Sequence, residues 1–196
     1  MPDYTPEFEA RVKKWSRAQQ EKKRYKHTKR VVKTADELAA RWAPDEAVVC
    51  RLAGWIHDAA KEWDDAELLR YAENAGVPIS AAERENPMLL HGVVAYLLAD
   101  AEFGLHDGRL RTACAYHTSG SPQMSLTDKI VFLADLIEPK RDFPSVAALR
   151  ERAFEDLDSA LLMAVQGTVR YLLDERQHID PRVIELHNVL LRAGVT

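Results

Sequence analysis

Apolar residues recur along most of the chain at intervals of three and four positions, which is the spacing of one face of an α-helix. The clearest stripe has steps of four, four, three and four, and it consists of His27, Val31, Ala35, Leu38 and Trp42. No segment shows the strict alternation of apolar and polar residues that is typical of a half-buried strand. The pattern therefore predicts an all-α fold, a helical bundle of about eight to ten helices.

Caps, prolines and glycines indicate where these helices begin and end. Thr5 followed by Pro6 starts the first, and Ser125 with Asp128 forms a capping-box pattern before a strongly apolar stretch. The expected helices cover residues 5–25, 27–42, 44–61, 64–76, 87–104, 107–118, 126–137, 155–177 and 181–192, with shorter helical turns near 80–83 and from 145. The chain contains no internal repeat and no low-complexity linker.

Composition and charge narrow the class of protein. The 196 residues are 46% hydrophobic and 30% charged, as in an ordinary globular protein. The formal net charge of −4 argues against extended nucleic acid as a partner, and no apolar run reaches the ~20 residues that span a membrane. Cys50 and Cys114 lie among apolar and small residues, so we expect reduced thiols and a cytoplasmic location.

Ionisable side chains interrupt several apolar segments, where burial without a partner is costly. Asp135 is the most informative, because all the remaining residues of 130–137 are apolar. His57 and Asp58 follow an apolar run, and His91 lies inside another beside Gly92, which allows a backbone or a ligand to approach closely. An ion pair with Arg or Lys would satisfy Asp135, as a metal would, and an ordinary hydrogen bond in the core would explain either histidine alone.

Two more histidines occupy an inward helix face and a helix end. His27 has a plain explanation as a polar residue at a helix start, and His117 has one as a cation at a helix C-terminus. His106, His178 and His187 occupy a loop, a charged helix end and a structural helix position, so they serve as controls. One shared cause explains four such histidines and two aspartates better than separate coincidences, and imidazoles with carboxylates are ligands of divalent transition metals.

The order of these residues resembles the HD-domain metal phosphohydrolase superfamily, and the two additional histidines resemble its two-metal members. The flanking segments are similar to the YqeK family of bacterial symmetrical bis(5'-nucleosyl)-tetraphosphatases. These segments are 56–61, 89–92, 116–120, 124–126 and 134–143. The resemblance covers residues 22–192, so we expect an N-terminal helical extension over 1–21 and an HD metal-dependent phosphohydrolase domain over 22–196.

The resemblance implies a ligand set and a reaction. His27, His57, Asp58 and Asp135 would hold one metal, and Asp58 would bridge to a second metal completed by His91 and His117. Iron is the metal implied, with manganese, cobalt or nickel as alternatives for such nitrogen and oxygen ligands. The implied reaction is hydrolysis of diadenosine tetraphosphate to two ADP by a metal-activated hydroxide.

Four further residues are candidates for substrate binding. Lys61 lies one helical turn after His57 and could contact a phosphate or the metal surroundings, although an ion pair with Glu62 or Asp65 would explain it equally well. Arg141 could bind a phosphate in a forked geometry or pair with Asp142. The small residues Thr118 and Gly120 could donate to a phosphate or form an ordinary turn. We expect Asp58 and Lys61 to be the catalytic residues.

Two other functions fit the same residues. One is a different HD enzyme, a nucleotidase or a nucleoside di- or triphosphate hydrolase. The other is a non-catalytic nucleotide-binding module with a structural metal. The two C-terminal helices are amphipathic and could serve a homodimer or simply close the bundle.

Overall fold

The computed structural model describes residues 4–196, and that part of the chain is helical without a strand. The elements are α1 (Pro6–Ala18), α2 (Lys22–Trp42), η1 (Pro44–Glu46), α3 (Ala47–Ile56), α4 (Asp65–Asn74), α5 (Ala81–Glu85), η2 (Pro87–Leu90), α6 (His91–Phe103), α7 (Gly108–Tyr116), α8 (Leu126–Ile137), α9 (Val146–Glu155), α10 (Leu157–Asp174) and α11 (Pro181–Arg192). The all-α prediction is confirmed.

Local capping accounts for several helix starts. Thr5 accepts a hydrogen bond from the backbone N–H of Phe8, and Pro6 occupies the first helical position of α1. Complete capping boxes precede α4, α5 and α8, with Asp64, Ser80 and Ser125 as their N-caps. The predicted range 126–137 coincides with α8, and 181–192 coincides with α11.

Three predicted helices were wrong at their ends. The helix expected over 5–25 ends at Ala18, and α2 begins at Lys22, five residues before its expected start at His27. The helix expected to reach residue 61 ends at Ile56, because the backbone bonds beyond it change from four-residue to three-residue spacing. This tighter turn carries His57 and Asp58 away from the helical path.

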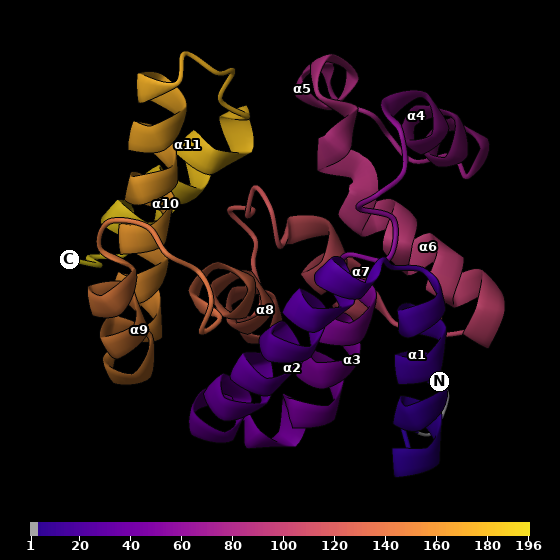
Figure 1. Cartoon of the computed structure of the whole chain (residues 1–196). Helices are drawn as coiled ribbons and strands as arrows, with labels where there is room; N and C mark the ends of the chain where they lie inside the picture. Colours follow the sequence, from indigo (N-terminus) through magenta and orange to yellow (C-terminus); the bar gives the residue numbers. More distant parts are fainter. Residues whose placement is uncertain (1–3) are drawn as a thin grey trace.

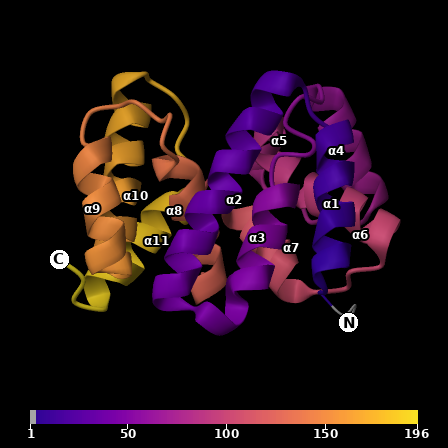
Figure 2. The same cartoon turned by 60° about the horizontal axis from the view of Figure 1, so that its bottom comes forward.

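The helices form two groups on either side of a shared middle layer. In Figures 1 and 2, α9, α10 and α11 lie on one side, α1, α4 and α6 lie on the other, and α2, α3 and α8 lie between them. Each side has its own apolar core, and the middle helices contribute to both. Thus Val32 of α2 belongs to one core and Val31 to the other. The predicted metal ligands lie along this boundary.

Helix α1 packs against α3 rather than standing apart from it. Phe8, Val12 and Ser16 are its buried residues, and the hydroxyl of Ser16 donates to the carbonyl of Trp55 at 2.6 Å. Glu9 binds the guanidinium of Arg51 through two nitrogens. These contacts hold the part of α3 that leads directly to His57, while a domain boundary at residue 21 stays a prediction.

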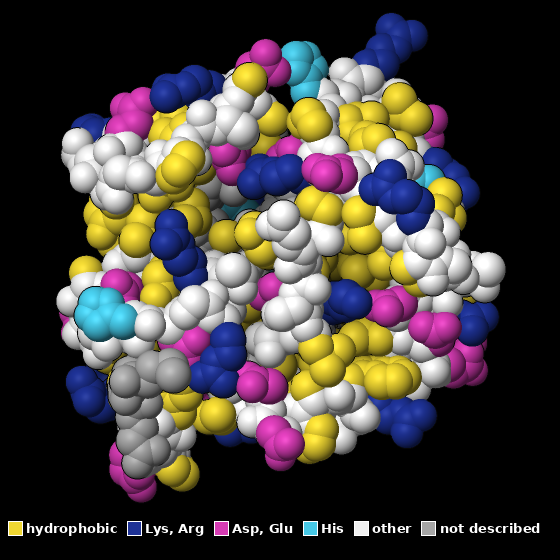
Figure 3. All heavy atoms as spheres, turned by 180° about the vertical axis from the view of Figure 1, so that it is seen from behind, with side chains coloured by type: hydrophobic (Ala, Val, Ile, Leu, Met, Phe, Trp, Pro, Cys, Tyr) yellow, Lys and Arg dark blue, Asp and Glu magenta, His cyan; other side chains and the backbone are white. Residues whose placement is uncertain are grey.

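On the face that Figure 3 shows, basic and acidic side chains are interspersed, and no large patch of one charge is visible. Among the helices of the described residues, none is long and apolar enough to cross a membrane.

Candidate metal centre

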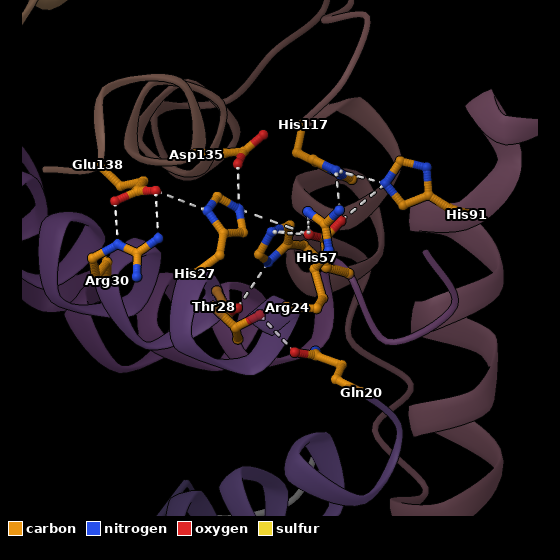
Figure 4. A network of polar contacts seen from close by, with 12 residues as sticks. Gln20, Arg24, His27, Thr28, Arg30, His57, His91, His117, Asp135 and Glu138 are labelled. Carbon is orange, nitrogen blue, oxygen red and sulfur yellow. Dashed lines mark hydrogen bonds and ion pairs between the residues drawn. The ribbon is translucent and has the colours of Figure 1, made fainter. Parts of the chain in front are cut away.

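The fold brings together all six residues that the sequence predicts as metal ligands. His27 lies on α2, His57 and Asp58 follow α3, and Asp135 lies on α8. The other two are His91, the first residue of α6, and His117, which follows the end of α7. Figure 4 shows the four histidines and Asp135 pointing toward one another from their separate elements. Residues far apart in the chain, such as His27 and Asp135, are therefore neighbours in the structure.

Asp58 is the centre of the arrangement, and its side chain is only 4% exposed. Its Oδ2 faces Nε2 of His57 at 3.4 Å and Nε2 of His27 at 3.7 Å. Its Oδ1 faces Nε2 of His91 at 3.2 Å and Nε2 of His117 at 3.8 Å. One carboxylate thus stands between two pairs of histidines, with one oxygen toward each pair.

Asp135 completes the first of these pairs. Its Oδ1 lies 2.9 Å from Nε2 of His27, and His27, His57 and Asp135 offer ligand atoms that all lie within 4.8 Å of one another. The same oxygen also accepts from Nη2 of Arg141 at 2.8 Å. Asp135 therefore has the arginine partner that the alternative interpretation expected as well as a place among the histidines.

The Nδ1 atom of each histidine is held by a neighbouring oxygen. His57, His91 and His117 each face the carbonyl three residues earlier, that of Gly54, Met88 and Cys114 respectively. Nδ1 of His27 lies 3.1 Å from Oε1 of Glu138. An acceptor at Nδ1 places the proton there, so all four Nε2 lone pairs are directed into the centre.

These atoms fit divalent metals. Nε2 of His27 and of His57 are buried and have no hydrogen-bond partner, although buried polar atoms normally have one. Nε2 of His91 and of His117 lie only 2.9 Å apart. A cation shared by such lone pairs and carboxylates would satisfy them, and the nitrogen and oxygen donors suit divalent transition metals.

Electrostatics favour the ligand forms of the two aspartates and of His117. At His57 burial opposes protonation, but the charge of Asp58 outweighs it and raises the pKa. Burial opposes ionisation of Asp58, but His57 and His91 lower its pKa well below the ordinary value. Burial likewise opposes ionisation of Asp135, whereas the adjacent His27 and the charges of His57 and Arg141 hold its pKa low. Burial and the neighbouring histidines lower the pKa of His117 to about 3. Ionised carboxylates and neutral imidazoles are the forms that bind metals.

A cavity of about 230 Å³ opens beside this centre. Its lining consists of Asp58, Lys61, His117, Thr118, Phe132, Asp135, Leu136, Arg141 and Thr168. Three of the four predicted substrate-binding residues, Lys61, Thr118 and Arg141, are among them. The cavity therefore joins the metal ligands to cationic, hydroxyl and apolar side chains.

Lys61 and Gly120 have different surroundings. Within residues 4–196, no ion pair of Lys61 with Glu62 or Asp65 is present, and burial lowers the pKa of the Lys61 ammonium despite the opposing charge of Asp58. Gly120 does not line the cavity. Its φ is +69°, and a Cβ there would lie 2.5 Å from a methyl of Leu186, so this glycine serves the turn and its packing against α11.

Sequence reasoning missed three charged residues of the centre. Nη1 of Arg24 lies 3.0 Å from Oδ2 of Asp58. Glu138 is buried between His27 and Arg30 and also accepts from the backbone N–H of Lys140. The available signal was helical spacing, because Arg24 precedes His27 by one turn and Glu138 follows Asp135 at the same interval.

An all-α domain with four converging imidazoles and a central carboxylate belongs to the class of histidine- and aspartate-based metal proteins. The HD domain family model matches residues 24–140 of this chain, and the chain belongs to that family. HD domains bind divalent metals, and the histidine and aspartate cluster described above is present here.

Named relatives cover most of the chain. A symmetrical bis(5'-nucleosyl)-tetraphosphatase of Bacillus subtilis is 35% identical over 86% of this chain and 89% of its own length. A protein of the same name from Staphylococcus aureus is 32% identical over 91% of this chain and 92% of its own. A crystal structure from Clostridium acetobutylicum, described as a predicted HD superfamily hydrolase involved in NAD metabolism, superposes with a TM-score of 0.90 at 33% identity, covering 98% of this chain and 99% of that one.

Proposed function

We propose that this chain hydrolyses diadenosine tetraphosphate to two molecules of ADP. The observation that carries the proposal is the position of Asp58, whose two oxygens each face a pair of histidine Nε2 atoms beside a cavity lined by cations. Relatives named for the symmetrical reaction match along 86% and 91% of the chain, which supports the choice of substrate.

The centre would hold two divalent metal ions, with iron as our first choice and manganese, cobalt or nickel as alternatives. His27, His57, Asp58 and Asp135 would hold one ion, and Asp58, His91 and His117 the other. Such ions lower the pKa of a bound water and offset negative charge on phosphoryl oxygens. None of these proposed ligands is a cysteine, which supports a metal that prefers nitrogen and oxygen ligands.

Residues of the cavity would bind and orient the polyphosphate. Lys61 and Arg141 carry positive charge into it, and Thr118 adds a hydroxyl. These two cationic side chains can hold the polyphosphate so that one of its inner phosphorus atoms faces Asp58. In-line attack of water on that phosphorus then releases one ADP on each side. Phe132 and Leu136 supply an apolar wall, which strengthens these charge contacts by keeping water out.

The test is anaerobic purification, metal analysis, and chromatography of the products formed from diadenosine tetraphosphate. About two metals per chain and ADP as the sole product support the proposal. ATP with AMP would contradict symmetrical cleavage. Release of phosphate from mononucleotides without cleavage of this substrate would favour another HD hydrolase, and nucleotide binding without turnover would favour the non-catalytic module.

Lys61→Ala gives the sharpest test of substrate binding, because this side chain lines the cavity and is not one of the metal ligands proposed here. We expect kcat/KM to fall about 10–100-fold, the effect of losing a charge-assisted hydrogen bond of ~1.5–3 kcal/mol. Lys140→Ala removes an equal charge from an exposed position nearby and should leave kcat/KM unchanged. Equal effects of the two substitutions would contradict a direct role for Lys61.

Two further properties belong to this proposal. A cytoplasmic location is supported by Cys50 and Cys114, which are buried free cysteines.

A homodimer through the C-terminal helices is supported by four exposed large apolar side chains of α10 and α11, namely Tyr171, Leu173, Ile184 and Leu191. Light scattering of the purified protein measures the oligomeric state directly.

A further inference from the structure

The four histidines of the centre differ in what holds Nδ1. Three of them face a neutral backbone carbonyl, at Gly54, Met88 and Cys114. Only His27 faces a carboxylate, that of Glu138. Only one of the two groups of ligands therefore contains a histidine held by a carboxylate, because His27 lies with His57 and Asp135, while His91 and His117 lie together on the other side of Asp58.

Glu138 is built into its place rather than exposed at the surface. Its side chain is 3% exposed, and Oε1 accepts from Nδ1 of His27 and from Nη2 of Arg30 at 2.9 Å. Oε2 accepts from Nε of Arg30 and from the backbone N–H of Lys140 at 2.7 Å. Figure 4 shows Glu138 on the side of His27 that faces away from the other histidines.

The charge of Glu138 is maintained by these partners. Arg30 donates to both of its oxygens and the backbone N–H of Lys140 donates to Oε2, so the ionised carboxylate is stabilised in place. An ionised carboxylate that accepts the Nδ1 proton makes the opposite nitrogen of an imidazole a stronger donor. A neutral carbonyl has a smaller effect, so Nε2 of His27 should be the strongest metal donor among the four Nε2 atoms.

We propose that Glu138 is a positioning residue that makes the His27, His57 and Asp135 position the tighter of the two metal positions and so sets the order of loading. The inference rests on the metal centre of the proposed function, but it does not depend on the substrate. Partners of this outer kind typically change metal affinity by about 10–100-fold.

The experiment is a titration of the metal-free full-length protein with Co²⁺ alone. Binding is measured by calorimetry and by the visible absorption of the bound ion. The unaltered protein should bind in two steps of unequal affinity. Glu138→Gln keeps an oxygen that can accept from His27 and removes the charge. It should weaken the tighter step at least 10-fold and the weaker step less than three-fold.

Two control variants separate this role from general support of the fold. Glu83→Gln makes the same change at another buried glutamate that binds an arginine, Arg182, away from the centre, and both steps should stay as they were. Arg30→Gln leaves the carboxylate beside His27 but removes the partner that binds both of its oxygens, so the tighter step should weaken, by less than in Glu138→Gln. Melting curves of every variant report the intact fold.

Three results would overturn the proposal. These are equal affinities for both ions in the unaltered protein, a tighter step in Glu138→Gln within three-fold of the original, and a loss in Arg30→Gln as large as in Glu138→Gln. The first uses the natural chain and stands even if a variant fails to fold. Unequal steps that respond to Glu138, without cleavage of diadenosine tetraphosphate, would reject the proposed substrate and keep this inference.

Discussion

At Gly92 the backbone of α6 approaches that of α7 too closely for any side chain. A Cβ there would lie 2.1 Å from the carbonyl oxygen of Cys114 and 2.9 Å from Nδ1 of His117. The sequence predicted a close approach at this glycine, and the structure confirms it. Because the Cys114 carbonyl also orients the ring of His117, Gly92 affects both the packing and the metal centre.

Gly92→Ala should therefore move α6 away from α7 and turn His117 out of position. We expect the free energy of unfolding to fall by about 1–3 kcal/mol, as for overpacking in a core, and one of the two proposed metals to be lost. Denaturant unfolding and metal analysis measure the two effects.

Gly167→Ala is the matched control, because Gly167 lies within α10 and a Cβ added there would meet no neighbouring atom within 4 Å. That variant should gain about 0.5–1 kcal/mol from helix propensity and keep its metals. Similar losses in the two variants would contradict the steric explanation for Gly92.

At the scale of an element, α7 depends on its N-cap. Asp107 accepts from the backbone N–H of Arg109, from the guanidinium of Arg109 at 2.7 Å and from the hydroxyl of Tyr4 at 2.9 Å. Burial opposes ionisation of Asp107, but these hydrogen bonds hold its pKa below the ordinary value. The cap thus joins the start of α7 to the segment before α1.

Asp107→Asn should lower the free energy of unfolding by about 1–3 kcal/mol at pH 7. A depressed pKa in the folded state stabilises the protein fully above the unfolded pKa of ~3.9, and this contribution is lost as the pH falls through the folded value. The difference between the two proteins should therefore shrink below about pH 4, as urea unfolding at pH 7 and pH 3 would show.

Asp65→Asn controls for removal of a negative charge, because Asp65 is an exposed residue in the first turn of α4. Its effect should stay within about 0.5 kcal/mol at either pH. A constant difference between Asp107→Asn and the unaltered protein across this pH range would show that the charge of Asp107 is not the cause.

At the scale of the molecule, α1 and α3 belong to one core. Val12 is fully buried, and Phe8 and Trp15 of α1 both pack edge-on against Phe103 of α6. Since α3 leads into His57 and Asp58, the support that α1 gives to this core extends to the metal centre.

Deleting residues 1–18 should therefore reduce both the stability and the metal content of the chain. We expect a loss of more than about 3 kcal/mol, because several buried side chains are removed together. Thermal unfolding and metal analysis test this. Lys14→Ala on the exposed side of α1 should change neither quantity. A truncated protein with unchanged stability and metal content would show that 1–18 is a dispensable extension.

The sequence by itself determined the helical class, many helix starts and the six residues that meet at the centre. Caps act over three or four residues, so Ser125 and Asp128 reveal the start of α8 without knowledge of its neighbours. A carboxylate such as Asp135 within an apolar segment must find a partner on folding, which makes it conspicuous before the partner is known.

The tertiary structure alone decided how those residues face one another. Which oxygen of Asp58 meets which histidine, that Glu138 holds His27, and that Gly120 turns toward Leu186 all depend on the packing of separate helices. The early end of α3 has the same origin, because the turn after Ile56 places His57 and Asp58 between the two cores. Local pattern identifies a polar residue that needs a partner, but contacts between distant elements choose the partner.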